Sequence, residues 1–152
     1  MNIGRSYEVD VAEGSFARKE MTVPAALPEL ERVLFFIGEM LAELQCSDKG
    51  RMQIRIAVDE IFSNIVRHSD ARKGDTVTVI LQAEAETRTA EITFMDGSLR
   101  FDPLSAAEPD LTAPAGKRPV GGLGLFLVKK MMDEVSYEYR DGMNILTIRK
   151  KV

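Results

Sequence analysis

A chain of 152 residues is long enough for one domain with a hydrophobic core and too short for two ordinary ones. Its net charge of -4 gives no basic field for nucleic acid or anionic lipid, so nucleic-acid and membrane-surface proteins are disfavoured. The single cysteine excludes an internal disulfide framework, and neither a signal pattern nor an apolar run of the ~18 residues needed for a membrane span is found. We therefore expect a soluble, cytoplasmic protein.

The first half of the chain predicts one strand followed by two helices. Residues 1–17 have scattered apolar positions and indicate a tail or a short edge strand, whereas residues 18–23 alternate loosely as in a strand. After a turn with two prolines, apolar residues recur every three or four positions over residues 30–44, the pattern of a helix packed on a core. A second helix is predicted over residues 48–70, with Ser47 or the residue after it as N-cap.

The second helix carries a ridge of polar residues. On a helical wheel Glu60, Asn64 and His68 follow one another along the border of the apolar face. A carboxylate, an amide and an imidazole in this arrangement can hold a hard cation, orient a nucleophile or contact a phosphate. Polar residues with this spacing also border many amphipathic helices, so a purely structural role stays open.

The second half predicts two hairpins separated by a long loop and a short amphipathic helix over residues 125–135. Residues 76–84 and 89–95 are β-branched and alternating, and residues 136–140 and 144–150 flank an Asp-Gly turn dipeptide. Residues 98–119 contain four prolines and few apolar residues, which indicates a loop, and loops of this length are usually binding loops or lids.

Hairpin-linked strands with grouped helices fit an α+β fold. We expect a two-layer α/β sandwich in which a mostly antiparallel mixed sheet carries helices on one face. Residues 18–152 would form one domain, preceded by the tail or edge strand of residues 1–17. The strand order does not follow from the pattern.

Two further motifs lie at the ends of the long loop. Asp96 and Gly97 end the strand before it, where a carboxylate can accept a hydrogen bond from a base amine or simply stabilise a turn. Gly121, Gly122 and Gly124 open the helix after it, so backbone N–H groups could approach a phosphate at the positive helix end. A hinge or close helix packing would require the same glycines, and the spacing fits neither a P-loop nor a dinucleotide fingerprint.

The order of these motifs is more specific than any one of them. The chain resembles the ATP-binding domain of the histidine-kinase-like (GHKL) ATPases, and among them the bacterial anti-sigma regulatory factors that are serine/threonine kinases. The resemblance covers residues 18–151. The segment VDEIFSNIVRH matches the N box, Asp96 with Phe101-Asp102-Pro103 matches the adenine-binding box, and GGLGLFLVKKMMD, residues 121–133, matches the phosphate-binding box.

This resemblance implies a role for each matching residue. Glu60 would be the catalytic general base, and Asn64 would hold the magnesium ion that bridges the triphosphate of ATP. These roles agree with the chemistry of a carboxylate and an amide oxygen. The other cofactor-binding residues would come from the same three boxes: His68, Asp96, Gly97, Gly121, Gly122, Leu123 and Gly124.

The resemblance thus implies a Mg-ATP-dependent serine/threonine kinase that phosphorylates a STAS-type anti-anti-sigma partner and binds a sigma factor, regulating transcription by partner switching. One residue departs from it: Ser98 stands where the family usually has glycine, and a side chain there would crowd the base or require a local rearrangement. This departure favours the alternative, a partner-switching module that binds nucleotide weakly or not at all and transfers no phosphoryl group. A detached histidine-kinase ATP domain is disfavoured, because no phosphoacceptor helix precedes the N box, and a homodimer is left open.

Overall fold

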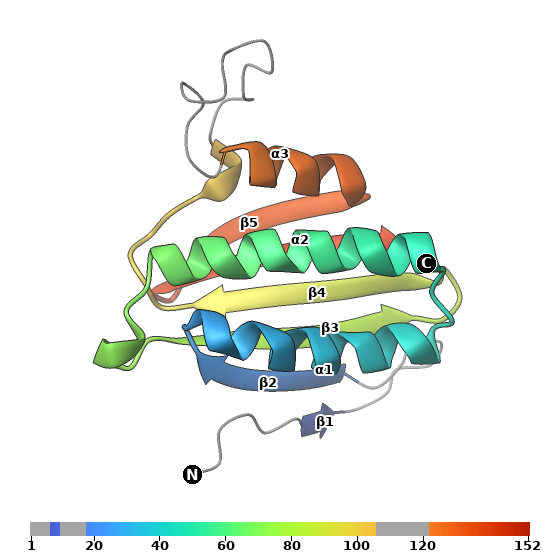
Figure 1. Ribbon diagram of the computed structural model, residues 1–152, viewed down its shortest axis with the longest axis horizontal. Helices are drawn as coiled ribbons and strands as arrows, with labels where there is room; N and C mark the ends of the chain where they lie inside the picture. Colours follow the sequence, from blue (N-terminus) through green and yellow to red (C-terminus); the bar gives the residue numbers. More distant parts are fainter. Residues whose placement is uncertain (1–6, 10–17, 106–121) are drawn as a thin grey trace.

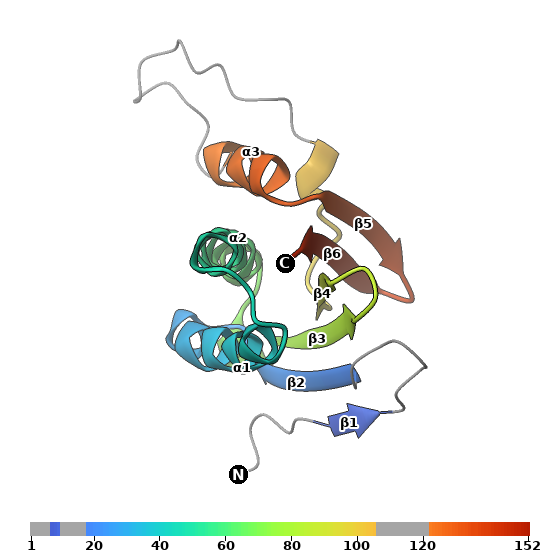
Figure 2. The ribbon, with the colours of Figure 1, turned by 90° about the vertical axis from the view of Figure 1, so that its right-hand side faces the viewer.

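The computed structural model describes residues 7–9, 18–105 and 122–152, which form helices packed on one face of a six-stranded sheet (Figures 1 and 2). The strands are β1 (Tyr7–Val9), β2 (Arg18–Pro24), β3 (Thr76–Glu84), β4 (Thr89–Asp96), β5 (Glu134–Arg140) and β6 (Met143–Lys151). The α-helices are α1 (Leu30–Glu43), α2 (Asp48–Arg67) and α3 (Gly122–Met131), with short 3-10 turns at Leu27–Glu29, Ala71–Lys73 and Pro103–Ser105. The expected α+β sandwich is confirmed. None of the helices in the described ranges is long and apolar enough to cross a membrane.

The strand order of the sheet is β1-β2-β3-β4-β6-β5. Every neighbouring pair of described strands is antiparallel, so the sheet lacks the parallel pairs that a mixed sheet would contain. β6 lies between β4 and β5, which places the start of β6 beside the end of β4. Asp96 and Asn144 are consequently direct register partners.

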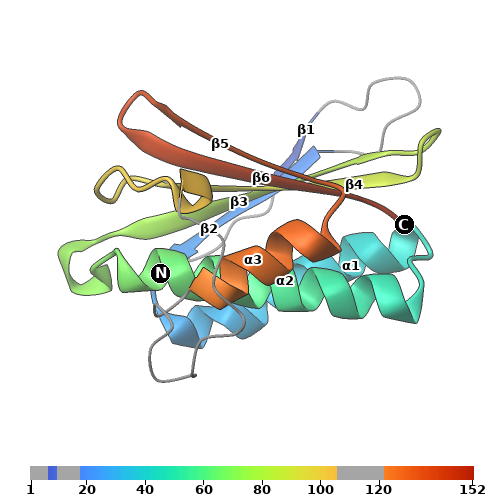
Figure 3. The same ribbon diagram turned by 90° about the horizontal axis from the view of Figure 1, so that it is seen from above.

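Helix α2 is central to the helical layer, between α1 and α3 (Figures 2 and 3). Ser47 is its N-cap, and its side chain accepts a hydrogen bond of 3.1 Å from the backbone N–H of Gly50. The apolar face of α2 is buried in the core, and full burial of such side chains contributes about 1.5–3 kcal/mol each. These buried residues are Ile54, Ala57, Val58, Ile61, Phe62 and Ile65.

Helix α3 begins and ends earlier than the helix predicted over residues 125–135. The amphipathic pattern continues to Val135, but α3 ends at Met131 and β5 begins at Glu134. Val135 is paired with Ile148 of β6, and the N–H of Asp133 donates to the carbonyl of Arg149 at 3.0 Å. Sheet pairing therefore replaces the last helical turn.

Candidate functional site

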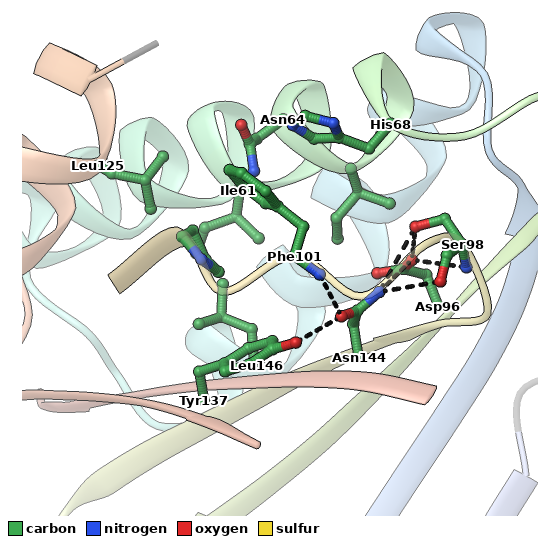
Figure 4. Close-up of a pocket in the computed structure, with 12 residues that line it drawn as sticks. Ile61, Asn64, His68, Asp96, Ser98, Phe101, Leu125, Tyr137, Asn144 and Leu146 are labelled. Carbon is green, nitrogen blue, oxygen red and sulfur yellow. Dashed lines mark hydrogen bonds between the residues drawn. The ribbon is translucent and has the colours of Figure 1, made fainter. Parts of the chain in front are cut away.

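A small cavity lies under the C-terminal end of α2, where α2 faces the end of β4 and the start of β6 (Figure 4). Its polar lining comes mainly from Asn64, His68, Asp96 and Asn144. The cavity volume is about 20 Å³, which is room for roughly one water molecule. Side chains in its wall must therefore move before a ligand as large as a purine can enter.

Asp96 is the buried acceptor of this cavity. It is the last residue of β4, and only 5% of its surface is exposed. Its Oδ1 accepts hydrogen bonds from the Ser98 N–H at 3.1 Å, from the Ser98 hydroxyl, and from Nδ2 of Asn144 at 3.2 Å. Within the described residues no donor bonds to Oδ2. One oxygen of the carboxylate is thus fixed, and the other retains its capacity to accept a hydrogen bond from a ligand.

Asn144 holds the segment after β4 onto the sheet. Besides Asp96, its Nδ2 donates to the carbonyls of Leu99 at 3.1 Å and Ser98 at 3.3 Å. Its Oδ1 accepts from the N–H of Phe101 at 3.0 Å and from the Tyr137 hydroxyl at 2.6 Å (Figure 4). The buried amide therefore connects β4, β5, β6 and residues 98–101.

Asn144 was not among the site residues predicted from the sequence. Along β6 it occupies an inward-facing position in the alternation shared with Leu146 and Ile148, all of which are buried. A polar residue at an inward-facing strand position was the sequence feature that could have indicated a site residue. Its partner, Asp96, becomes known only from the register between β4 and β6.

His68 and Phe101 close the cavity on the side of the loop. His68 is the C-cap of α2, and its ring stacks on that of Phe101 with 4.2 Å between centroids and 28° between planes. The Phe101 side chain comes from the segment that Asn144 holds. The imidazole of His68, predicted to be a cofactor-binding residue, is thus stacked on an aromatic ring from the adenine-binding box.

Asn64 lies one helical turn before His68 and also lines the cavity. Its Oδ1 accepts a long hydrogen bond of 3.4 Å from Nη2 of Arg67. In the described ranges no three His, Cys, Asp or Glu side chains are grouped as a metal site. The amide oxygen of Asn64 is a hard ligand of the kind that suits Mg²⁺ alongside phosphate and water oxygens.

Glu60 is separate from this cavity, although it belongs to the same ridge of α2. Its half-buried side chain lies against Gly124 of α3. The predicted ridge therefore divides, with Asn64 and His68 at the cavity and Glu60 at the contact between the two helices.

The remaining predicted residues lie in the adenine and glycine boxes. A Cβ on Gly97 would meet only the Sδ of Met143, at an ordinary 3.5 Å, so packing does not require glycine there. Gly122 and Leu123 begin α3, and the following Leu125 lines the cavity. Gly121 lies outside the described residues.

Comparison with known proteins places the chain in a family. Residues 23–150 match the model of the histidine kinase-like ATPase domain, and the chain belongs to that family. It is 28% identical over 115 residues to the serine/threonine-protein kinase BtrW of Bordetella bronchiseptica, covering 76% of this chain and 80% of that protein. It is 24% identical over 135 residues to the serine-protein kinase RsbW of Bacillus thuringiensis, covering 86% of this chain and 83% of that protein.

A solved structure supports the same fold. The crystal structure of the RsbU and RsbW domains of a Mycobacterium tuberculosis protein aligns with a TM-score of 0.58 at 18% identity. The alignment covers 88% of this chain but 31% of that longer chain. The family resemblance and the fold predicted from the sequence are thereby confirmed.

Proposed function

We propose that this protein is a cytoplasmic serine/threonine kinase that uses Mg-ATP to phosphorylate a STAS-type anti-anti-sigma protein, and that it releases or binds a sigma factor accordingly. Residues 18–152 would act as its single ATP-binding kinase domain. The observation that carries the proposal is the buried Asp96 carboxylate, which has one oxygen fixed by donors beside the Asn64 amide of the N box. The serine-kinase names of the relatives support the same class.

The nucleotide would enter between α2 and the ends of β4 and β6. The adenine amine would donate to Oδ2 of Asp96, and the stacked rings of His68 and Phe101 would separate to enlarge the cavity of about 20 Å³. The phosphates would extend to the N-terminus of α3, where the positive end of the helix favours an anion.

Asn64 would supply a protein oxygen to the magnesium ion. The long contact from Arg67 is weak at 3.4 Å, so the Asn64 amide can exchange it for an ion. When bound, the ion neutralises charge on the triphosphate and orients it.

The reaction itself is a transfer from ATP to a serine hydroxyl. The serine oxygen would form a bond to the γ-phosphorus, while the bond from that phosphorus to the β,γ-bridging oxygen breaks and ADP leaves. Glu60 would accept the serine proton as this occurs and later release it to water. The products are phosphoserine and ADP.

The alternative is a partner-switching module without phosphoryl transfer. The small volume of the cavity favours it. The partner would then be bound regardless of nucleotide.

A binding assay combined with a transfer assay distinguishes the two. Melting temperature would be measured with ATP plus magnesium and with ATP plus chelator, and a STAS-type protein encoded nearby would be analysed by mass spectrometry after incubation with Mg-ATP. A kinase should show a larger thermal shift with magnesium and a gain of one phosphate on a serine of the partner. Partner binding without thermal shift or added phosphate would favour the switch.

A further inference from the structure

Where helices α2 and α3 pack together, the Glu60 side chain occupies the space beside Gly124. Gly124 is buried in the first turn of α3. A Cβ added to it would lie 2.0 Å from Oε2 of Glu60, 2.7 Å from its Cδ and 3.3 Å from its Cγ. These distances are below van der Waals contact, so the Glu60 carboxylate occupies the space that any side chain at position 124 would need.

This contact is unlike those of the other glycines whose surroundings the structure describes. Gly38, Gly74 and Gly142 have nothing within 4 Å of an added Cβ, and Gly97 has only an ordinary contact. At Gly50 the added Cβ would meet the Sγ of Cys46 at 2.8 Å. In this group, Gly124 has the shortest contact and the only one with a carboxylate.

We infer that Gly124 is a positioning residue for Glu60. Its missing side chain allows the carboxylate to lie against the first turn of α3, where the positive end of the helix also favours a negative charge. The inference rests on the proposed function, because it concerns how the general base of that reaction is held. It gives Gly124 a role other than the phosphate contact that its box implies.

The two roles of Gly124 predict different kinetics. If the glycine lets its backbone approach a phosphate, a side chain would weaken ATP binding and raise KM. If it provides space for Glu60, a side chain would displace the carboxylate and lower kcat, with ATP affinity kept. Fold stability should hardly change, because the displaced group is the end of a flexible side chain and Ala is favoured over Gly in a helix by about 1 kcal/mol.

The test is Gly124→Ala, compared with Gly38→Ala on α1, where an added Cβ meets nothing within 4 Å. We expect Gly124→Ala to slow single-turnover transfer by ~10²-fold, the scale of a lost general base, with ATP affinity and melting temperature near those of wild type. Gly38→Ala should leave transfer and ATP affinity unchanged and should raise the melting temperature slightly, because Ala is favoured over Gly in a helix interior. A loss of ATP affinity that accounts for the loss of turnover would overturn the inference in favour of a phosphate contact.

Combined variants test whether the effect passes through Glu60. In a Glu60→Gln background, Gly124→Ala should slow transfer no further, because the carboxylate is already absent. In a Glu60→Asp background the side chain is one methylene shorter. Gly124→Ala should therefore slow transfer by a smaller factor there than it does in the wild-type background. Independent, multiplicative losses would overturn the inference. If Gly124→Ala does not fold, adding Glu60→Ala should restore folding, and failure to do so would also overturn it.

A spectroscopic measurement separates this inference from the proposed function. The carboxyl carbon resonance of Glu60, recorded by NMR at one fixed pH, reports its surroundings without any turnover. Gly124→Ala should change the chemical shift of this resonance, whereas Gly38→Ala should not. An unchanged Glu60 signal would overturn the positioning role. If Gly124→Ala changes the Glu60 resonance but the wild-type protein transfers no phosphate, only the proposed kinase activity would be contradicted.

Discussion

Nδ2 of Asn144 lies 3.2 Å from Oδ1 of Asp96, and the two residues are register partners where β6 begins and β4 ends. This contact makes the Asp96 carboxylate part of the rigid sheet. Both this bond and the bond of 3.1 Å from the Ser98 N–H go to Oδ1 of Asp96. They therefore leave the other carboxylate oxygen, Oδ2, for a ligand. The properties of the cavity therefore depend on a strand residue outside the three boxes.

Asp96→Asn should reduce ATP affinity by about 10- to 100-fold. The replacement keeps the shape but substitutes a donor for one acceptor oxygen, and a hydrogen bond to a charged group contributes roughly 1.5–3 kcal/mol. Isothermal titration calorimetry with Mg-ATP measures the change. Asp59→Asn is the control, because Asp59 is exposed on α2 and its carboxylate accepts a local hydrogen bond of 3.2 Å from the Ser63 hydroxyl. Equal losses in the two variants would contradict a specific contact with the base.

Asn144→Ala should lower the free energy of unfolding by about 2–4 kcal/mol, because each polar group left without a partner costs roughly 1–3 kcal/mol. The groups that lose their acceptor are the Phe101 N–H and the Tyr137 hydroxyl. Urea denaturation measures the difference. Tyr137→Phe removes only one donor from the network, so its cost should be clearly smaller. If the two variants were equally destabilised, Asn144 would not have the connecting role seen here.

Tyr137 should make stability depend on pH in the alkaline range. Burial raises the pKa of its phenol above the usual 10.0; nearby Arg100 opposes this, and Asp102 adds to it. The unfolded chain therefore loses this proton at a lower pH than the folded chain. The stability that this raised pKa contributes is fully present below about pH 10, the pKa of the unfolded chain. It is lost as the pH rises through the pKa of Tyr137 in the folded protein. The unfolding free energy of wild type should thus fall more steeply above about pH 10 than that of Tyr137→Phe. Parallel curves from denaturation at several pH values would refute the shift.

Ser98 should support Asp96 more than it obstructs the base. Its hydroxyl and its N–H both bond to Oδ1 of Asp96. Ser98→Ala removes one of these donors and should weaken ATP binding by about 2- to 10-fold, matching a net hydrogen-bond contribution of roughly 0.5–1.5 kcal/mol. Tighter binding in both Ser98→Ala and Ser98→Gly would show instead that the side chain crowds the base. Fluorescence titration with a labelled nucleotide measures either outcome.

The local elements could be predicted from the sequence, because their signals are local. Apolar spacing over residues 30–44 predicted α1, the Ser47 cap predicted the start of α2, and the alternating run at residues 76–84 coincides with β3. The position of β6 between β4 and β5 could not be predicted in this way. It depends on contacts between segments about 50 residues apart, and such contacts produce no periodic pattern of residues in the sequence.

The candidate site also has features that local patterns predict and features that depend on long-range contacts. The helical period placed Glu60, Asn64 and His68 on one ridge, and the family boxes placed Asp96 near them. Which of these residues face the cavity depends on where α3 packs, so the contact of Glu60 with Gly124 could not be anticipated. The same holds for Asn144, whose partner is set by strand register.

Glu60 and Asn64 should separate chemistry from binding. Glu60→Gln keeps the size of the side chain and loses its basicity, so ATP affinity should persist while transfer slows by ~10²-fold or more, the usual scale for a positioned general base.

Asn64→Ala should behave differently, because it removes the proposed magnesium ligand. The metal would organise the triphosphate in both ground and transition states, so binding and turnover should fall together. Single-turnover transfer from labelled ATP to a STAS-type partner, measured alongside ATP affinity, tests both variants. Ser63→Ala is a control on the same helix, since its hydroxyl bonds to Asp59 at 3.2 Å. Wild-type transfer in Glu60→Gln would end the general-base assignment. Unaltered dependence of binding on magnesium in Asn64→Ala would remove Asn64 as the metal ligand.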